Sequence, residues 1–177
     1  MTRGETVVVE VGDCRVGRAP AVSLATYALG SCIAVVAWDW KLKLGGLLHV
    51  MLPDSSVDPE RGRLNPWVCA DTGVPALLKA LTDGGSSRTQ LRWCLAGEAA
   101  MVTDSPRYET GKRNHLALKK ILSGMGVFIE REDVGGTESR SLRLDLRTGQ
   151  LTVRRGSGSD QILAHAAMDF VKGYQNM

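Results

Sequence analysis

The chain has few of the features that mark nucleic-acid-binding, membrane or secreted proteins. Its formal net charge is only +3 over 177 residues, which predicts neither a nucleic-acid groove nor a membrane-binding patch, although it is compatible with an acidic partner. No run approaches the roughly 18 apolar residues of a membrane-spanning helix. The N-terminus lacks the apolar core of a signal peptide, so we expect a cytoplasmic protein without membrane insertion.

Cysteine is sparse, and its spacing excludes common metal and disulfide frameworks. Cys14, Cys32, Cys69 and Cys94 lie far apart, with no Cys-x-x-Cys pair, so a zinc knuckle is not expected. In a reducing cytosol they are predicted to be free thiols. No ligand cluster for a metal or other cofactor is visible, and neither repeats nor a proline-rich linker divide the chain. With 44% apolar residues, residues 1–177 are expected to form a single domain.

Two short apolar runs, residues 33–38 and 45–52, are separated by a few polar residues. This pattern is typical of a β-hairpin. A turn centred just after Trp40 would place Cys32 directly opposite His49. Opposed side chains on one face of an antiparallel pair have Cβ atoms about 4.5–5.5 Å apart. The hairpin therefore predicts that a thiol and an imidazole meet.

A paired thiol and imidazole can perform nucleophilic catalysis. The thiolate is the nucleophile, and a neighbouring imidazolium lowers the pKa of a cysteine thiol, so Cys32 is expected to be activated by His49. The same imidazole can protonate a departing amine. Backbone N–H groups of Gly30 and Ser31 are candidate donors to an oxyanion. Thr26 is a hydroxyl near enough in sequence to orient the imidazole.

Structural explanations exist for the same residues. A free cysteine usually behaves as a small buried hydrophobe, and a histidine on an apolar strand can be a hydrogen-bonded core residue. A one-residue slip in register would also turn the two side chains to opposite faces. Cys14, beside a turn, is a rival nucleophile, but it has no histidine nearby in the sequence.

Several separated motifs resemble, in the right order, those of CheD, the bacterial chemotaxis family of receptor glutamine deamidases. The likeness extends from about residue 6 to residue 153. The motifs are Ala-Leu-Gly-Ser-Cys-Ile-Ala-Val at 28–35, Gly-Gly-Leu-Leu-His-Val-Met-Leu-Pro at 45–53, Gly-Lys-Arg-Asn at 111–114, the Gly-Gly-x-x-x-Arg element within 133–140, and Thr-Gly-Gln-Leu-Thr-Val at 148–153.

The resemblance implies a Cys-His-Thr triad, and the matching positions here are Cys32, His49 and Thr26. It also implies that Arg113 and Asn114 lie near the active site, although a helix cap and a surface ion pair would explain them equally well. The expected fold is α+β, a mixed β-sandwich with flanking helices of the cysteine-deamidase toxin type.

The activity that the resemblance implies is hydrolysis of glutamine side-chain amides in the cytoplasmic helices of methyl-accepting chemoreceptors, with methylesterase activity possible at the same site. An alternative is an adaptor that binds receptors or a CheC-type phosphatase with little catalysis. A general cysteine amidase or protease is a third candidate. One departure is Ala96, which stands where family members usually carry the first glycine of a pair, with Glu98 after it.

The remaining pattern predicts several further elements. We expect strands over 6–11, 23–28, 91–101 and 127–132, a second hairpin from 140–146 and 151–154, and helices over 71–81, 115–123 and 160–174. Residues 54–66 are predicted to be a loop, either the rim of the site or a solvated connector. His115 and His165 are expected to be exposed, without a thiol partner.

Overall fold

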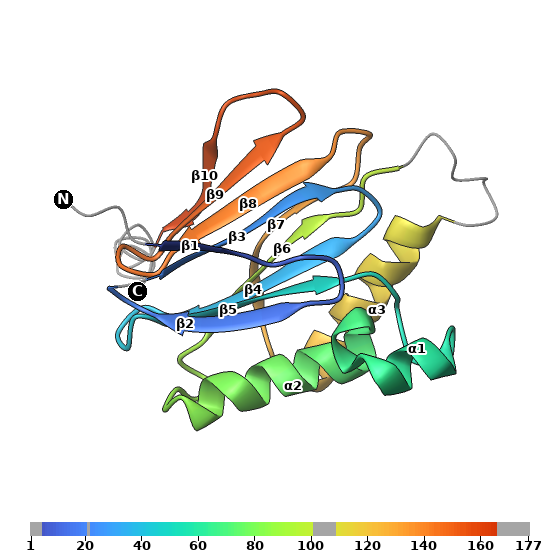
Figure 1. The fold of residues 1–177 in the computed structure, drawn as a ribbon, viewed down its shortest axis with the longest axis horizontal. Coiled ribbons are helices and arrows are strands. Elements are labelled where there is room, and N and C mark those ends of the chain that lie inside the picture. Colours follow the sequence, from blue (N-terminus) through green and yellow to red (C-terminus); the bar gives the residue numbers. More distant parts are fainter. Residues whose placement is uncertain (1–4, 21, 101–108, 166–177) are drawn as a thin grey trace, which may run out of the picture.

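The computed structural model describes residues 5–20, 22–100 and 109–165, and these residues form two stacked β-sheets with helices on one side (Figure 1). The first sheet has the order β1-β3-β8-β9-β10 and the second β2-β5-β4-β6-β7. The strands of the first sheet are β1 (Glu5–Val8), β3 (Val22–Leu29), β8 (Arg140–Asp145), β9 (Gln150–Arg155) and β10 (Gln161–His165). Those of the second sheet are β2 (Cys14–Arg18), β5 (Leu44–Val50), β4 (Ile33–Asp39), β6 (Arg92–Gly97) and β7 (Ile129–Val134). The expected α+β sandwich is confirmed.

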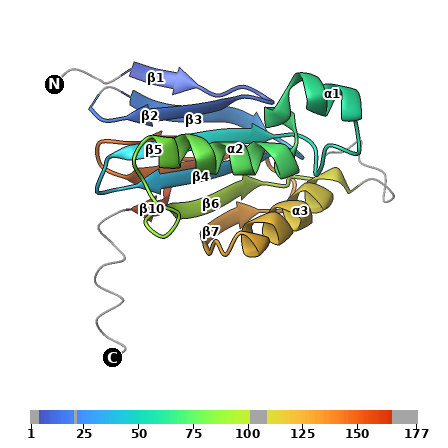
Figure 2. The ribbon, with the colours of Figure 1, turned by 90° about the horizontal axis from the view of Figure 1, so that it is seen from below.

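The helices cover the outer face of the second sheet. They are α1 (Pro59–Leu64), the 3-10 helix η1 (Pro66–Val68), α2 (Ala70–Asp83) and α3 (Thr110–Gly124). Seen from below, α2 and α3 both lie against strands of that sheet (Figure 2). The molecule therefore has three layers, and the second sheet is buried on both faces.

This double burial explains the unbroken apolar run in β4. Alternate residues point to opposite faces of a strand. Ala34, Val36 and Trp38 belong to the core between the two sheets. Ile33 and Val35, which point the other way, pack in the core beneath the helices. A strand covered on both faces is expected to lack polar alternation.

Both predicted hairpins are confirmed. β4 pairs with β5 and β8 pairs with β9, each antiparallel. Leu142, Leu144 and Leu146 are all buried in the core between the sheets, as the alternation predicted. The intervening residues of β8 are more polar and lie on its other face.

The predicted C-terminal helix over 160–174 is wrong where the structure describes it. Gln161–His165 form β10, which pairs antiparallel with the edge of β9. That pairing gives partners to backbone groups of β9 that an edge strand leaves open. Ile162 is exposed and Ala164 is buried, although they are two residues apart, because the register of the ladder shifts between them. Residues 166–177 lie outside the described part of the chain.

Residues 54–66 are not simply a loop, because they contain α1. The Asp58 side chain accepts a hydrogen bond from the Arg61 backbone N–H, and Pro59 occupies the first turn. Asp followed by Pro is a helix-start signal, which the prediction read as a break. The helix predicted from 71 begins instead at Ala70, and Asp71 binds the backbone N–H and hydroxyl of Ser55.

Candidate active site

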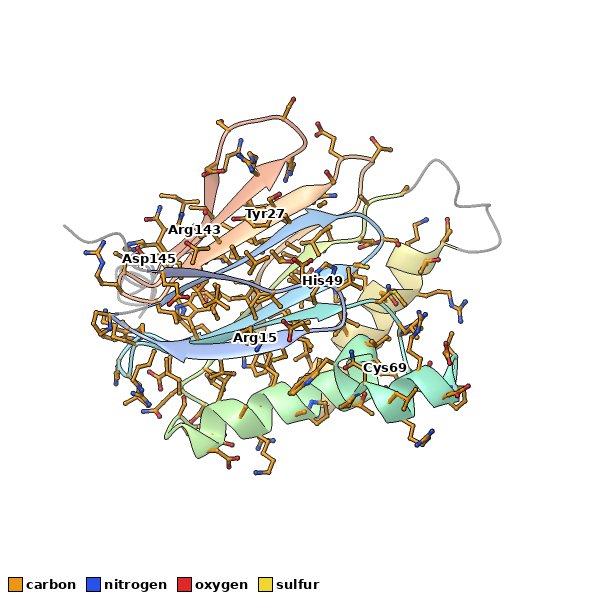
Figure 3. All side chains as sticks on the ribbon, viewed as in Figure 1. Arg15, Tyr27, His49, Cys69, Arg143 and Asp145 are labelled. Carbon is orange, nitrogen blue, oxygen red and sulfur yellow. The ribbon has the colours of Figure 1, made fainter. Side chains whose placement is uncertain are left out.

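His49 and Thr26 meet in the interior between the two sheets. Thr26 lies on β3 and His49 on β5, and both side chains are buried. Thr26 Oγ1 is 2.9 Å from His49 Nδ1 and 2.7 Å from the carbonyl oxygen of Val9. Figure 3 shows His49 among the strands, whereas Cys69 lies beside the helices. The two sheets therefore bring together residues that are far apart in the sequence.

The threonine hydroxyl decides which imidazole nitrogen carries the proton. A hydroxyl has one hydrogen to donate, and Thr26 donates it to the Val9 carbonyl. The His49 Nδ1 must then donate to Thr26 Oγ1, so a neutral imidazole has its lone pair on Nε2. Nε2 is buried and has no hydrogen-bond partner among the described residues. It is a base with an unoccupied acceptor position.

The surroundings of His49 favour its neutral form. Burial lowers the pKa of the imidazole below its usual value, and the Val9 carbonyl acts more weakly in the opposite direction. A histidine whose pKa lies below 6.5 is unprotonated at neutral pH. His49 can therefore accept a proton through Nε2 while Nδ1–H stays bonded to Thr26.

Cys32 lies one residue before β4, on the same side of the hairpin as His49. The ladder pairs Ala34 with His49 and Ile33 with Val50, so the predicted register, with Cys32 directly opposite His49, is wrong by two residues. A shift of two preserves the face, and Cys32 packs against the core between the sheets. Diagonal neighbours of this kind have Cα atoms about 7–8 Å apart.

Burial favours the uncharged forms of both Cys32 and His49, so the lowered thiol pKa expected from the sequence is not found. No hydrogen bond joins them in the part of the chain that the structure describes, and unliganded catalytic hydrogen bonds are often long. Burial raises the pKa of the Cys32 thiol above 9.0. A thiol of this kind needs a base to remove its proton, and His49 Nε2 is the candidate for that base.

The backbone at Gly30, Ser31 and Cys32 is held by its carbonyl oxygens. The Gly30 carbonyl accepts from the Ala99 N–H and the Cys32 carbonyl from the Glu98 N–H. Among the described residues, no backbone hydrogen bond outside the regular elements uses the N–H groups of these three residues. Successive free N–H groups are suited to binding an anion.

Gly97 permits the close contact between the end of β6 and Cys32. Its φ is +135°, and a Cβ there would lie 2.1 Å from the Cys32 carbonyl oxygen. Ala96, the departure from the family pattern, pairs with Ala34 and is buried in the core between the sheets. The position where an added side chain would strike the Cys32 loop is thus still glycine.

Arg113 and Asn114 have different environments. Asn114 is not a helix cap, because α3 begins at Thr110 and Asn114 lies inside it, fully buried. Its Nδ2 donates to the carbonyls of Ser31 (3.2 Å) and Met51 (2.9 Å). Arg113 is exposed. Hydrogen bonds from Ser56 are the main cause of the lowered pKa of Asp54, and the positive charge of Arg113 lowers it further by a smaller amount.

The expectation that His115 is exposed is wrong, since its side chain is only 15% exposed. Its Nδ1 lies 2.6 Å from Glu98 Oε2 and its Nε2 lies 3.0 Å from Glu132 Oε1. The interaction depends on a turn of backbone at Glu98, where φ is +60°. No sequence spacing signals this contact, since it joins α3 to β7 and to the end of β6. His165 lies on β10 and is partly buried.

The other cysteines lack the surroundings of Cys32. Cys14 pairs with Leu48 and packs beneath the helices, on the face opposite His49. Burial and then the Asp13 carboxylate raise the pKa of Cys14 to about 12. Cys69 and Cys94 are fully buried free thiols.

A groove of about 530 Å³ runs between α1 and the end of β5. It is lined by Val11, Met51, Asp58, Glu60, Arg61, Leu64, Asn65 and Val68. Met51 would be opposite Cys32 if the β4–β5 ladder continued by one pair. The segment predicted as either rim or connector therefore forms one wall of a groove close to the hairpin end.

The described residues include no helix long and apolar enough to cross a membrane. Within the same ranges, no group of three or more His, Cys, Asp and Glu side chains is arranged to hold a metal ion.

Comparison with known proteins supplies an independent finding. A family model described as CheD chemotactic sensory transduction matches residues 51–155. A protein of Solibacter usitatus named "probable chemoreceptor glutamine deamidase CheD" is 46% identical over 159 residues, covering 90% of this chain and 94% of the relative. Similarly named proteins are 40% identical in Syntrophus aciditrophicus, covering 86% of this chain and 95% of the relative, and 37% identical in Pyrococcus abyssi, covering 92% and 98%.

Proposed function

This chain belongs to the CheD family, and on that premise we propose that it is a chemoreceptor glutamine deamidase with Cys32 as nucleophile, His49 as base and Thr26 as orienting residue. The observation that carries the proposal is the buried His49 imidazole, whose Nδ1 is bonded to Thr26 and whose Nε2 has no partner among the described residues. Hydrolysis of a glutamine amide needs a base of this kind.

The reaction begins when the Cys32 sulfur attacks the carboxamide carbon while His49 Nε2 removes the thiol proton. The carbonyl oxygen becomes an oxyanion, which N–H groups of the Gly30–Ser31–Cys32 loop are free to bind. The imidazolium keeps its Nδ1–H bond to Thr26. It then gives its Nε2 proton to the departing nitrogen, so ammonia leaves and a thioester remains.

Water completes the cycle. His49, neutral again, takes a proton from water as the hydroxide oxygen attacks the thioester carbon. As the C–S bond breaks, the His49 imidazolium gives its proton to the Cys32 sulfur, so the glutamate side chain is released and the thiol and the neutral imidazole are regenerated. One water is consumed and one ammonia is released for each glutamine. All of these proton transfers use side chains of the chain itself.

The proposed substrates are glutamines on the cytoplasmic helices of methyl-accepting chemoreceptors, which makes the cytoplasm the proposed location. A CheC-type phosphatase is a further proposed partner. The net charge of +3 suits a receptor surface of opposite sign. The groove beside Met51 offers a wall of mixed apolar and charged residues for such a contact.

The decisive experiment incubates the full chain with a receptor cytoplasmic fragment and measures ammonia release together with the mass of the fragment. Each deamidated glutamine gains about 1 Da as NH₂ is exchanged for OH. Cys32→Ala is expected to lower release by about 10⁴-fold or more while fragment binding is retained. Cys14→Ala, on the other face of the sheet, is the matched control and should release ammonia at the wild-type rate.

Two results would contradict the proposal. Undiminished release by Cys32→Ala would remove the thiol from the mechanism. A wild-type chain that binds the fragment without releasing ammonia would instead support the adaptor alternative. Thr26→Val tests the orienting residue: kcat is expected to fall about 10- to 100-fold, whereas Thr26→Ser, which keeps the hydroxyl, should retain activity.

A further inference from the structure

Asn114 is the side chain that completes the hold on the nucleophile loop. The carbonyls of Gly30 and Cys32 bind backbone N–H groups, and the carbonyl between them, that of Ser31, binds Asn114 Nδ2 at 3.2 Å. Three successive carbonyls are thus occupied. In the same stretch, the three N–H groups have no backbone acceptor outside the regular elements of the described chain.

The peptide bond links these two facts. The Ser31–Cys32 bond is trans, because the one cis bond in the described residues is elsewhere. In a planar trans peptide the C=O and the N–H point in opposite directions. An amide that holds the Ser31 carbonyl on one side therefore directs the Cys32 N–H to the other side.

Asn114 also ties this loop to the strand that carries the base. The same Nδ2 donates to the Met51 carbonyl at 2.9 Å, two residues after His49 and just beyond the end of β5. One amide group therefore joins the approach to Cys32 with the exit from the His49 strand. Its own Oδ1 is buried without a partner among the described residues, an arrangement that lowers stability.

The next residue of α3 supports the other end of the loop. His115 Nδ1 lies 2.6 Å from Glu98 Oε2, and the Glu98 N–H binds the Cys32 carbonyl at 3.2 Å. Consecutive residues of one helix thus hold the Ser31 carbonyl directly and the Cys32 carbonyl through Glu98. The loop is fixed to α3 on both sides of the Cys32 residue.

We propose that Asn114 is a positioning residue that aims the Cys32 N–H at the oxyanion formed during deamidation. The inference rests on the proposed function. Asn114 itself does not touch the reacting atoms; it acts through the Ser31–Cys32 peptide. Its loss is expected to weaken stabilisation of the tetrahedral intermediate and to leave substrate binding and the thiol unchanged.

The test compares two reactions of the same thiol in the full chain. Ammonia release from a receptor fragment passes through an oxyanion, whereas alkylation of Cys32 by iodoacetamide displaces iodide and forms none. Asn114→Ala is expected to lower kcat about 100-fold, the effect of one lost oxyanion donor, with KM and the alkylation rate within about twofold. Mass spectrometry assigns the alkylated cysteine.

Asn114→Asp protects the test against a folding failure, because it keeps the size and polarity of the side chain but a carboxylate cannot donate to Ser31. For this variant the ratio of kcat to the alkylation rate is expected to fall at least about tenfold. Leu122→Ala, a fully buried position on the same helix, is the control. It should lower stability while leaving this ratio unchanged.

The outcomes separate this inference from the proposed function. Wild-type kcat in the variants, or a parallel loss of kcat and alkylation, would overturn the positioning role while wild-type ammonia release still supports deamidation. A loss in the ratio for Leu122→Ala equal to that for Asn114→Ala would overturn it too. Absence of ammonia release from the wild-type chain would overturn both proposals.

Discussion

One hydroxyl group sets the protonation of the candidate base. Thr26 donates to the Val9 carbonyl and therefore accepts from His49 Nδ1, which leaves the lone pair of a neutral imidazole on Nε2. Burial lowers the pKa of His49 and raises the pKa of Cys32. Both directions stabilise the uncharged forms, so the proposed attack by Cys32 would need His49 to remove the thiol proton.

The lowered pKa of His49 predicts a pH dependence of stability. The unfolded chain binds a proton near pH 6.5, whereas the folded chain binds it only at lower pH. The contribution of His49 to the stability of the folded state is complete above about pH 6.5. It is lost as the pH falls toward the pKa of His49 in the folded state, because the unfolded state then holds more protons. His49→Gln should therefore lose less stability than wild type between about pH 7 and about pH 5.

Urea unfolding at a series of pH values measures this effect. The variant can be less stable at every pH; the slope of stability with pH is what decides. Subtracting the two curves removes the contribution of other titrating groups that the substitution leaves unchanged. Parallel curves would show that His49 binds its proton equally in the folded and unfolded states.

At the scale of elements, the candidate site depends on how closely β6 approaches the loop before β4. The Glu98 and Ala99 N–H groups bind the loop carbonyls, and this contact needs a residue without a side chain at Gly97. The end of β6 is held in turn by the Gly135 N–H, which donates to the Gly97 carbonyl at 3.1 Å. The loop thus takes its shape from a neighbouring strand.

Gly97→Ala tests that contact. The added Cβ would lie 2.1 Å from the Cys32 carbonyl oxygen, at a φ of +135°. We expect a loss of at least about 2 kcal/mol in the free energy of unfolding and a fall in ammonia release. Urea unfolding and the ammonia assay measure the two effects.

Gly124→Ala is the matched control, since a Cβ there meets nothing within 4 Å. At this helical position alanine should be neutral or raise stability by up to about 1 kcal/mol. If Gly97→Ala were as stable and active as Gly124→Ala, the close approach of β6 would have no part in shaping the loop.

At the scale of the whole molecule, an ion cluster around the buried Asp133 and Arg140 joins the two sheets, with Arg155 at its exposed side. Asp133 lies on β7 of the second sheet, and it accepts from Arg140 Nε at 3.0 Å and Arg155 Nη2 at 2.8 Å, which lie on β8 and β9 of the first. Burial alone would raise the pKa of Asp133, but hydrogen bonds from Arg155 and Arg140 outweigh it and lower the pKa. Arg140 is the arginine of the Gly-Gly-x-x-x-Arg motif.

Arg140→Met should be strongly destabilising, because it removes one cation from a buried carboxylate. Because Arg155 still binds the carboxylate, the expected loss is about 1.5–3 kcal/mol in the free energy of unfolding. Lys79→Met, which breaks the exposed Lys79–Asp83 pair on α2, is the control and should cost less than about 1 kcal/mol. Similar urea midpoints for the two variants would contradict a structural role for the cluster.

The sequence determined the faces of the hairpin strands, because side chains alternate with a period of two. That periodicity explains why the predicted register could be wrong by two residues and still place Cys32 and His49 on one face. It also located the inward leucines of β8. The motifs that resemble CheD predicted the family of the chain, and the comparisons with known proteins confirm it.

Tertiary structure alone decided the contacts around those side chains. The Val9 carbonyl and the Asn114 amide contact residues that are distant in sequence, and no pattern in the residue letters identifies these partners. The local sequence predicts that Asn114 is a helix cap, because asparagine is favoured at that position. In the structure it is buried inside the helix, and its amide donates to the carbonyls of Ser31 and Met51. Local propensity cannot specify a partner that only the packing of two sheets and a helix brings within reach.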